Sequence, residues 1–476
     1  MQLLSIFTKG NEAMAQRIVA FLLIFLLLAS VAMAKEKKQT NGPKTLSIEE
    51  TVYGVLRTHR SLRGMRENHE VLRHELSRAK AGFGPHIDLE GRTGESLLSD
   101  ATTRGTKLDQ DMYGSLSASA KLVQPIWDGF ATRSRVRDAA SSLESMRYRV
   151  FDSATSLSLD GIIAHIDVLR RRKIVDLAVE NIREHREILS QARERARLGA
   201  DTAAEVTQTQ SRLSRAQSNL SEARAALVVA EQTYLRLTGL VPNALQPVTL
   251  PPDVFESADS VYDMAQKANP KLASYLHDIR SQVARRELTE ASFYPTFNLE
   301  VGPTYSNRSG STDRWIYSFD VLATMRWNIF NSWADVAEKK AASARIRQYR
   351  HQLYDYLDTL KLEIETSWAN YKAAKEEYHH YARAVEYNKY TKMAYIEQFT
   401  IGKRSLLDVL DTINELYTSS TQAETARGNI LVGAYRLSGL TGNLLPSMGI
   451  TSSFFKKAVP RDRADRRERF APSWFH

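Results

Sequence analysis

Two carboxylates three residues apart are the clearest candidate for chemistry in this chain. Asp408 and Asp411 end the segment IGKRSLLDVLD (401–411), in which a glycine and two cations precede an apolar stretch. Residues three apart on a helix point to one side, so both acids would share one face. The alternative interpretation is a solvated helix face near a helix N-terminus, where the dipole favours carboxylates.

No other group of residues indicates catalysis. The sequence has no GxSxG, HExxH, P-loop or Cys/His cluster, so we expect no enzyme, no cofactor and no metal site. His379 and His380 stand in a tyrosine-rich segment and are typical of a helix surface. The formal charge is +10 without a basic stripe interleaved with aromatics, which argues against a nucleic-acid partner.

The N-terminus predicts export. A basic flank and an apolar run (18–31) precede Ala-Met-Ala, so residues 1–34 resemble a signal peptide, with a retained membrane anchor as the alternative. Translation could start at Met1 or at Met14. The chain has no cysteine, so an exported form would have neither a disulfide nor a lipid-modified N-terminal Cys. Its stability must then come from packing or oligomerisation.

The chain also resembles itself. AGFGPHIDLEGRTG matches ASFYPTFNLEVGPT 210 residues later, and LGADTAAEV matches IGKRSLLDV 203 residues later, which indicates a tandem duplication. We predict a first repeat at 45–241, a proline-rich linker at 242–255 and a second repeat at 256–445. The basic stretch 446–476 is predicted to be a disordered tail.

Helical and strand patterns alternate in each repeat. A 3,4 apolar spacing from about Trp333 to Thr400 predicts a coiled-coil helix on the order of 100 Å long. Around 86–124 and 296–327 the period falls to two, which predicts one hairpin per repeat that is long enough to cross a bilayer. The predicted lipid-facing residues are Trp315, Tyr317, Phe319, Val321 and Trp327.

A hairpin pair in a soluble sandwich is the alternative to a membrane sheet. Four strands cannot close a barrel alone, and open strand edges are not tolerated in lipid. If the hairpins lie in a membrane, several copies must share one barrel.

With its signal sequence, duplicated helix, hairpin, helix, helix plan and the turns LGADTAAEV and IGKRSLLDVLD, the chain resembles the TolC family of outer-membrane channel-tunnels over about residues 45–445. The resemblance implies a mixed fold of α-helices and transmembrane β-strands. A long coiled-coil α-helical barrel, the periplasmic tunnel, would join a β-barrel shared by a trimer with four strands from each chain.

The resemblance also implies a location and partners. We expect a homotrimer in lipid of the outer membrane of a Gram-negative bacterium, docked to a periplasmic adaptor protein and an inner-membrane ABC transporter. The stretches WDGFATRSRV, MRWNIFNSWADV and LRLTGLVP resemble most the branch that serves type I protein secretion. Alternatives are the duct of a multidrug efflux pump, with a proton-driven transporter, and a periplasmic coiled-coil structural or adaptor protein. The cargo stays open.

Site residues follow from the resemblance alone. The family's matching turn lies at the periplasmic end of the tunnel, where two acids face the pore, so Asp408 and Asp411 would form the pore constriction. Gate latch candidates are Arg404, Glu205 and Phe399, the last standing where a well-known member has a hydrogen-bonding Tyr. The adaptor-docking turns would contain Leu198, Gly199, Ile401 and Gly402.

Overall fold

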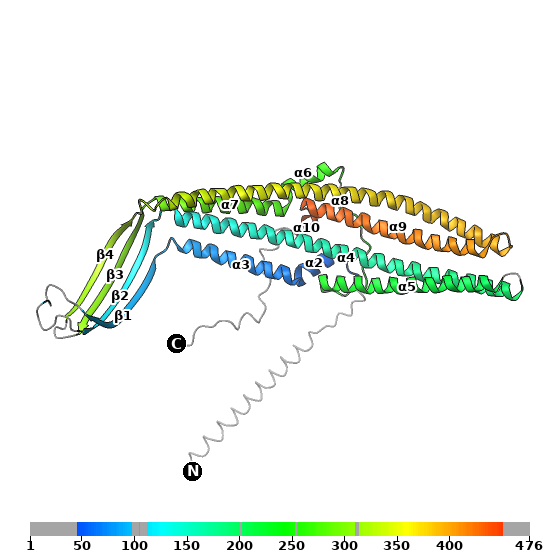
Figure 1. The fold of residues 1–476 in the computed structure, drawn as a ribbon, viewed down its shortest axis with the longest axis horizontal. Coiled ribbons are helices and arrows are strands. Elements are labelled where there is room, and N and C mark those ends of the chain that lie inside the picture. The colour runs from blue at the N-terminus through cyan, green and yellow to red at the C-terminus, as the bar shows by residue number, and fades with distance from the viewer. Residues whose placement is uncertain are drawn as a thin grey trace, which may run out of the picture. The chain divides into compact units, whose positions relative to one another are not determined.

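The structure is a computed structural model that describes most of the chain. The described residues are 45–97, 104, 112–199, 202–252, 255–309 and 314–450. The predicted signal peptide (1–34) and the part of the predicted tail from 451 onward lie outside them. The chain divides into two units, Met1–Leu46 and Ser47–His476, and the second contains every element labelled in Figure 1.

The helices of the two repeats match in order and, to within one residue, in length. The pairs are α2 (Ile48–Thr58) with α6 (Ala258–Ala268), α3 (Arg60–Ala81) with α7 (Pro270–Glu290), α4 (Ala131–Arg197) with α8 (Ala334–Thr400), and α5 (Ala203–Thr238) with α9 (Leu406–Thr441). α4 and α8 both have 67 residues, and α5 and α9 both have 36. Each residue of α4 and α5 therefore has a counterpart 203 positions later, in α8 or α9. The short α10 (Leu444–Ser447) and a 3-10 turn (Ala291–Phe293) complete the set.

The four strands form one antiparallel sheet in the order β1-β2-β3-β4. Their bounds are β1 (His86–Leu97), β2 (Met112–Trp127), β3 (Thr296–Ser309) and β4 (Arg314–Arg326). The two predicted hairpins are present, and β2–β3 pairing joins them into one sheet. Figure 1 shows the sheet at one end of the long helices and the α4–α5 and α8–α9 turns at the other end.

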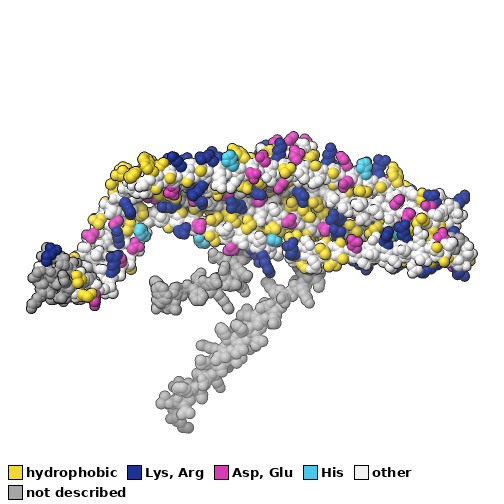
Figure 2. Space-filling view, in the orientation of Figure 1, with side chains coloured by type: hydrophobic (Ala, Val, Ile, Leu, Met, Phe, Trp, Pro, Cys, Tyr) yellow, Lys and Arg dark blue, Asp and Glu magenta, His cyan; other side chains and the backbone are white. Residues whose placement is uncertain are grey.

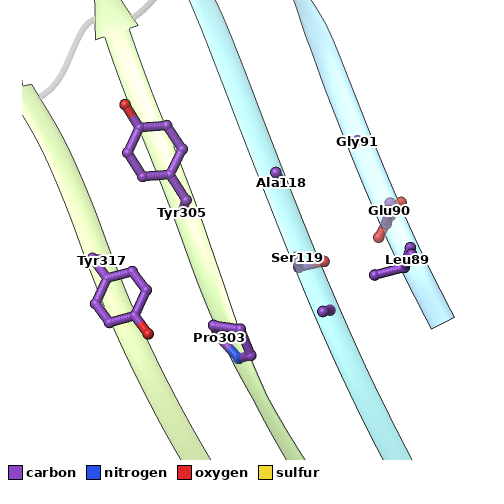
Figure 3. Close-up of a pocket in the computed structure, with 9 residues that line it drawn as sticks. Leu89, Glu90, Gly91, Ala118, Ser119, Pro303, Tyr305 and Tyr317 are labelled. Carbon is purple, nitrogen blue, oxygen red and sulfur yellow. The ribbon is translucent and has the colours of Figure 1, made fainter. Parts of the chain in front are cut away.

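The strand register places apolar residues on one face of the sheet. Gly91 pairs with Ala118, Ala118 with Tyr305, and Tyr305 with Tyr317, so one row of the face crosses all four strands. In Figure 3, Tyr305 lies on the strand between those that carry Ala118 and Tyr317, and these residues line a shallow depression of about 440 Å³. The opposite face is rich in polar residues, among them Ser117, Ser119, Thr304, Ser306 and Ser318.

Helix packing joins the repeats side by side. α4 packs against α5, α7 and α9, and α8 packs against α7 and α9. No helix or strand lies between Gly239 and Ser257 among the described residues, and the linker at 242–255 stays a prediction. Among the described helices, none has an apolar stretch long enough to cross a membrane.

One predicted boundary is wrong. The tail was expected to begin at 446, but α10 runs to Ser447 and Ile450 is only 1% exposed. Ile450 belongs to a core cluster with Leu444, Leu445 and Ile162 of α4. Burial of these apolar side chains extends the folded part to at least Ile450.

Candidate functional site

The turn between α8 and α9 is built by one glycine and one serine. Gly402 has φ +73°, a left-handed conformation that favours glycine, and its N–H donates to the Phe399 carbonyl at 3.0 Å. The Lys403 N–H donates to the Gln398 carbonyl at 2.8 Å, which completes a helix C-terminal Schellman motif. Ser405 then caps α9 by accepting from the Asp408 N–H at 3.2 Å. Asp408 is thereby fixed in the first turn of α9.

The turn between α4 and α5 has the same plan with a stronger cap. Gly199 has φ +79°, and Thr202 begins α5. The Glu205 side chain accepts from the Thr202 N–H at 2.8 Å, and the Thr202 hydroxyl accepts from the Glu205 N–H at 3.3 Å. This capping box gives Glu205 a structural role, and its role as a latch stays a prediction. Ala200 and Asp201 of this turn lie outside the described residues.

Arg404 and Asp408 are brought together by the turn. Arg404 Nε lies 3.3 Å from Asp408 Oδ2, and the guanidinium lies 3.8 Å from the centre of the Tyr395 ring. Both partners belong to the α8–α9 coil that carries Arg404. In the single chain the guanidinium is therefore held by a carboxylate and an aromatic ring of its own repeat.

Asp411 makes an ion pair that the sequence did not indicate. Its Oδ1 accepts from Arg212 Nη2 at 2.9 Å, across α9 and α5. The Asp411 side chain is 49% exposed, so the pair adds on the order of 1 kcal/mol or less. Each predicted pore acid uses one oxygen in its ion pair, Oδ2 of Asp408 and Oδ1 of Asp411. Both acidic side chains stay partly exposed, 43% for Asp408 and 49% for Asp411.

Phe399 is a core residue at the junction of the repeats. Its side chain is 2% exposed and packs in a cluster with Ile188 and Ala192 of α4 and with residues of α9. Arg195 of α4 lies 4.6 Å above the Phe399 ring and donates to its carbonyl at 3.1 Å. These two contacts of Arg195 hold α4 against α8. A phenyl ring has no polar atom that could form a hydrogen-bonded latch. The latch role of Phe399 stays a prediction.

A second intrachain contact lies nearby. Lys392 Nζ of α8 is 2.5 Å from Glu184 Oε1 of α4, and both side chains are largely buried. Removing one partner of such a pair leaves a buried charge, which typically costs about 3–5 kcal/mol. Together with the Arg195–Phe399 contact, this pair holds the two coils of one chain together near their turns.

The inter-repeat linker is anchored by a buried histidine. His165 of α4 accepts at Nδ1 from the Thr51 hydroxyl at 2.9 Å and donates from Nε2 to the Gln246 carbonyl at 3.0 Å. The Tyr234 hydroxyl lies 2.9 Å from the same Thr51 oxygen. Burial lowers the pKa of His165, because the charged imidazolium would lose its solvation.

The predicted lipid-facing residues of β4 share the apolar face. Tyr317, Phe319 and Val321 face the same side as Tyr305, Pro303 and Val301 of β3. Trp327 lies one residue past the end of β4, and its Nε1 donates to the Phe293 carbonyl at 3.2 Å. That these side chains contact lipid stays a prediction.

Exposed aromatic and aliphatic side chains gather where the sheet joins the helices, as Figure 2 shows. They include Phe130, Ile329, Phe330 and Trp333, which the sequence analysis did not single out. Aromatic side chains at the end of a membrane-spanning segment are typical of membrane–water interfaces. The sequence could have indicated most of this group, because WNIF and NSW stand directly after the alternating pattern of the last strand.

A duplicated chain with a membrane-type sheet at one end of long paired helices defines the class of outer-membrane channel-tunnel proteins. The outer membrane efflux protein family matches residues 52–240 and 261–443, and the chain belongs to this family. It is therefore an outer-membrane efflux channel with a periplasmic helical part, as the resemblance to the TolC family implied. This membership removes the alternative of a periplasmic adaptor.

The chain is also similar to individual outer-membrane proteins. Outer membrane efflux protein BepC of Brucella suis biovar 1 (strain 1330) is 22% identical over 403 residues, covering 84% of this chain and 86% of BepC. The outer membrane protein VceC of Vibrio cholerae has a TM-score of 0.68 at 13% identity and covers 85% of this chain and 96% of its own. The CmeC channel of Campylobacter jejuni has a TM-score of 0.69 at 14% identity, with coverages of 83% and 86%.

Proposed function

We propose that three copies of this chain form the exit duct of a type I protein secretion system. The observation that carries the three-copy duct is the sheet, which has one apolar face and two outer strands, β1 and β4, each paired on one side only within the described chain. An unpaired edge in lipid leaves backbone groups without partners, so β1 of one copy must pair with β4 of the next. With four strands from each chain, three copies supply twelve.

The duct would work with two partners. A periplasmic adaptor would dock at the turns around Leu198–Gly199 and Ile401–Gly402, and an inner-membrane ABC transporter would supply the cargo. The stretches WDGFATRSRV and MRWNIFNSWADV support the type I secretion branch by resemblance. The chain does no chemistry itself.

The closed end of the duct would be the ring of Asp408 and Asp411. Threefold symmetry gathers two carboxylates from each copy around one axis. Carboxylates held that close favour cations in the pore and bind multivalent cations. Arg404 and Glu205 would help to hold neighbouring coils together until the adaptor docks.

A multidrug efflux duct is the second candidate. The similarity to proteins whose names describe efflux, BepC among them, favours it. In that case the inner-membrane partner would be a proton-driven pump.

Deleting the gene separates the two candidates. Type I secretion predicts that a large protein disappears from the culture supernatant, measured by mass spectrometry, while drug susceptibility is unchanged. Increased susceptibility with an unchanged set of secreted proteins would favour the efflux duct. A purified protein that runs as a monomer after mild detergent extraction would contradict both.

A further inference from the structure

A cluster of aromatic rings continues the apolar face of the sheet to the start of the helices. Trp127 pairs directly opposite Phe297, so the two side chains point to the same face. Phe297 shares that face with Tyr305, because the two alternate in step along β3. The Trp127 ring centre lies 5.9 Å from that of Tyr294 and 6.0 Å from that of Phe130. We call Trp127, Phe130, Tyr294 and Phe297 the ring cluster.

The backbone keeps Phe130 exposed in an unusual conformation. Phe130 has φ +68°, in the left-handed region that is rare for a bulky residue, and its side chain is 53% exposed. Its counterpart in the second repeat, Trp333, has φ +65° and is 72% exposed. Strained residues of this kind are common at sites of function. Each repeat therefore presents an exposed ring where its long helix begins.

Arg133 lies in the first turn of α4, beside the ring cluster. Its side chain is exposed, and its guanidinium is 5.9 Å from the centre of the Phe130 ring. The nearby carboxylates bind other groups, since Asp128 accepts from a backbone N–H of α4 at 2.7 Å and Glu287 pairs with Arg137 at 2.7 Å. Among the residues that the structure describes, none forms an ion pair with Arg133. Its charge can therefore bind an external anion.

The second repeat has the rings without this cation. Phe330 and Trp333 lie edge to face with ring centres 6.1 Å apart, like their counterparts in the first repeat. Val336 stands at the position that corresponds to Arg133. The nearby Lys339 pairs with a carboxylate of α7 at 3.0 Å. The combination of exposed rings and an unpaired cation thus belongs to the first repeat.

The level of the ring cluster in the molecule indicates which anion it meets. The chain is an outer-membrane channel with a periplasmic helical part, so the sheet meets the helices at the periplasmic surface of the membrane. Figure 2 shows Lys and Arg side chains directly beyond the apolar group on the helical side. Phospholipid headgroups occupy this level, and a guanidinium binds phosphate through parallel hydrogen bonds.

We propose that Arg133 and the ring cluster bind the headgroup of an anionic phospholipid, phosphatidylglycerol for example, in the periplasmic leaflet of the outer membrane. The guanidinium contacts the phosphate, and the rings pack against the glycerol and the start of the acyl chains. Each chain has one such site. The proposal holds for a secretion duct and for an efflux duct alike. It rests on the lipid contact of the apolar face, which Phe319→Arg tests separately.

Native mass spectrometry tests the proposal by counting the lipids that stay on the protein. Protein in detergent micelles is mixed with phosphatidylglycerol or with zwitterionic phosphatidylcholine. The wild type should retain phosphatidylglycerol in preference, at one tightly held molecule per chain. Arg133→Gln should weaken this binding about fivefold, the effect of one cation at an anionic surface, while Arg133→Lys should keep most of it.

Arg224→Gln is the matched control. Arg224 is also an exposed arginine for which the described chain offers no ion-pair partner, and it lies on α5, away from the sheet in Figure 1. Its removal should leave the binding of phosphatidylglycerol unchanged. Equal retention of the two lipids by the wild type overturns the proposal. Unchanged binding in Arg133→Gln overturns it as well, as does an equal loss in Arg224→Gln.

A second measurement needs no variant. Raising the salt concentration should release phosphatidylglycerol from the wild type, because exposed charges are screened, and retention that does not depend on salt contradicts the proposal. The lipid face itself can fail separately. Equal destabilisation by Phe319→Arg and Ser318→Arg would remove that face, whereas a lipid face that shows no preference for phosphatidylglycerol would remove the Arg133 site alone.

Discussion

Phe319→Arg tests whether the apolar face of the sheet contacts lipid. Phe319 is the sixth of the 13 residues of β4 and is 60% exposed in the single chain, so in a barrel it would lie near the bilayer midplane. Its neighbours across the sheet are apolar, with Pro303 directly opposite on β3. An arginine on the lipid face of a barrel costs about 2–4 kcal/mol at the midplane.

That cost changes the folding equilibrium of each chain by a factor of roughly 30 to 700, at about 1.4 kcal/mol for each tenfold step. The assay is a urea titration of protein refolded into phospholipid vesicles, followed by tryptophan fluorescence. Ser318→Arg is the matched control. Ser318 lies one residue earlier on the polar face, where its hydroxyl donates to Asp320 Oδ2 at 3.1 Å, so an arginine there gains a nearby carboxylate.

Ser318→Arg should leave the urea midpoint nearly unchanged and alter the conductance of the channel. Equal destabilisation by the two substitutions would refute the reasoning, because it would mean that neither face of the sheet lies in hydrocarbon.

The core at the α4–α9 junction predicts that Phe399→Ala lowers the free energy of unfolding by about 3–5 kcal/mol in a urea titration; a loss below about 1 kcal/mol would mean that the ring is not packed there. Gly302→Ala should prevent β2–β3 pairing, because a Cβ at this position would lie 1.8 Å from the Ala120 carbonyl oxygen. A wild-type yield of heat-resistant trimer from this variant would contradict the prediction. Burial lowers the pKa of both His165 and His185, so the unfolded chain binds more protons than the folded chain once the pH falls below about 6.5. Stability should therefore be constant above about pH 7 and fall as the pH drops below about 6.5, with a smaller fall in His165→Gln; thermal melts at several pH values decide, and identical pH profiles for the two proteins would exclude His165 as a cause.

The sequence was most informative where local patterns repeat. The offset of 203 residues predicted the matching α4–α8 and α5–α9 pairs, and the two-residue alternation predicted both hairpins. These features depend on helix and strand periodicity, which a sequence carries directly. The capping box of Thr202 and Glu205 could also have been predicted, since Thr-x-x-Glu precedes an apolar pattern, but Glu205 was assigned to a latch instead.

Contacts between the repeats could not be predicted in the same way. The Arg212–Asp411 pair joins residues 199 positions apart, and it exists only because α5 and α9 approach each other around α4. Nothing in the local pattern distinguishes Arg212 from the other arginines of α5. Phe399 was predicted as a latch candidate, and its burial depends on α4 packing across it. The end of the fold was missed because Ile450 packs against residues far away in the chain.

The ion selectivity of Asp408→Ala with Asp411→Ala in planar bilayers tests the central claim, that the turn of the second repeat closes a pore. The matched control is Asp355→Ala with Asp358→Ala, which removes another exposed pair of acids three residues apart, on α8 and far from the turn. If this turn closes the pore, the 408/411 variant should lose its preference for cations and its block by trivalent metal ions, while the 355/358 variant keeps both. Wild-type selectivity and wild-type metal block in the 408/411 variant would contradict the account and leave these acids as a solvated helix face.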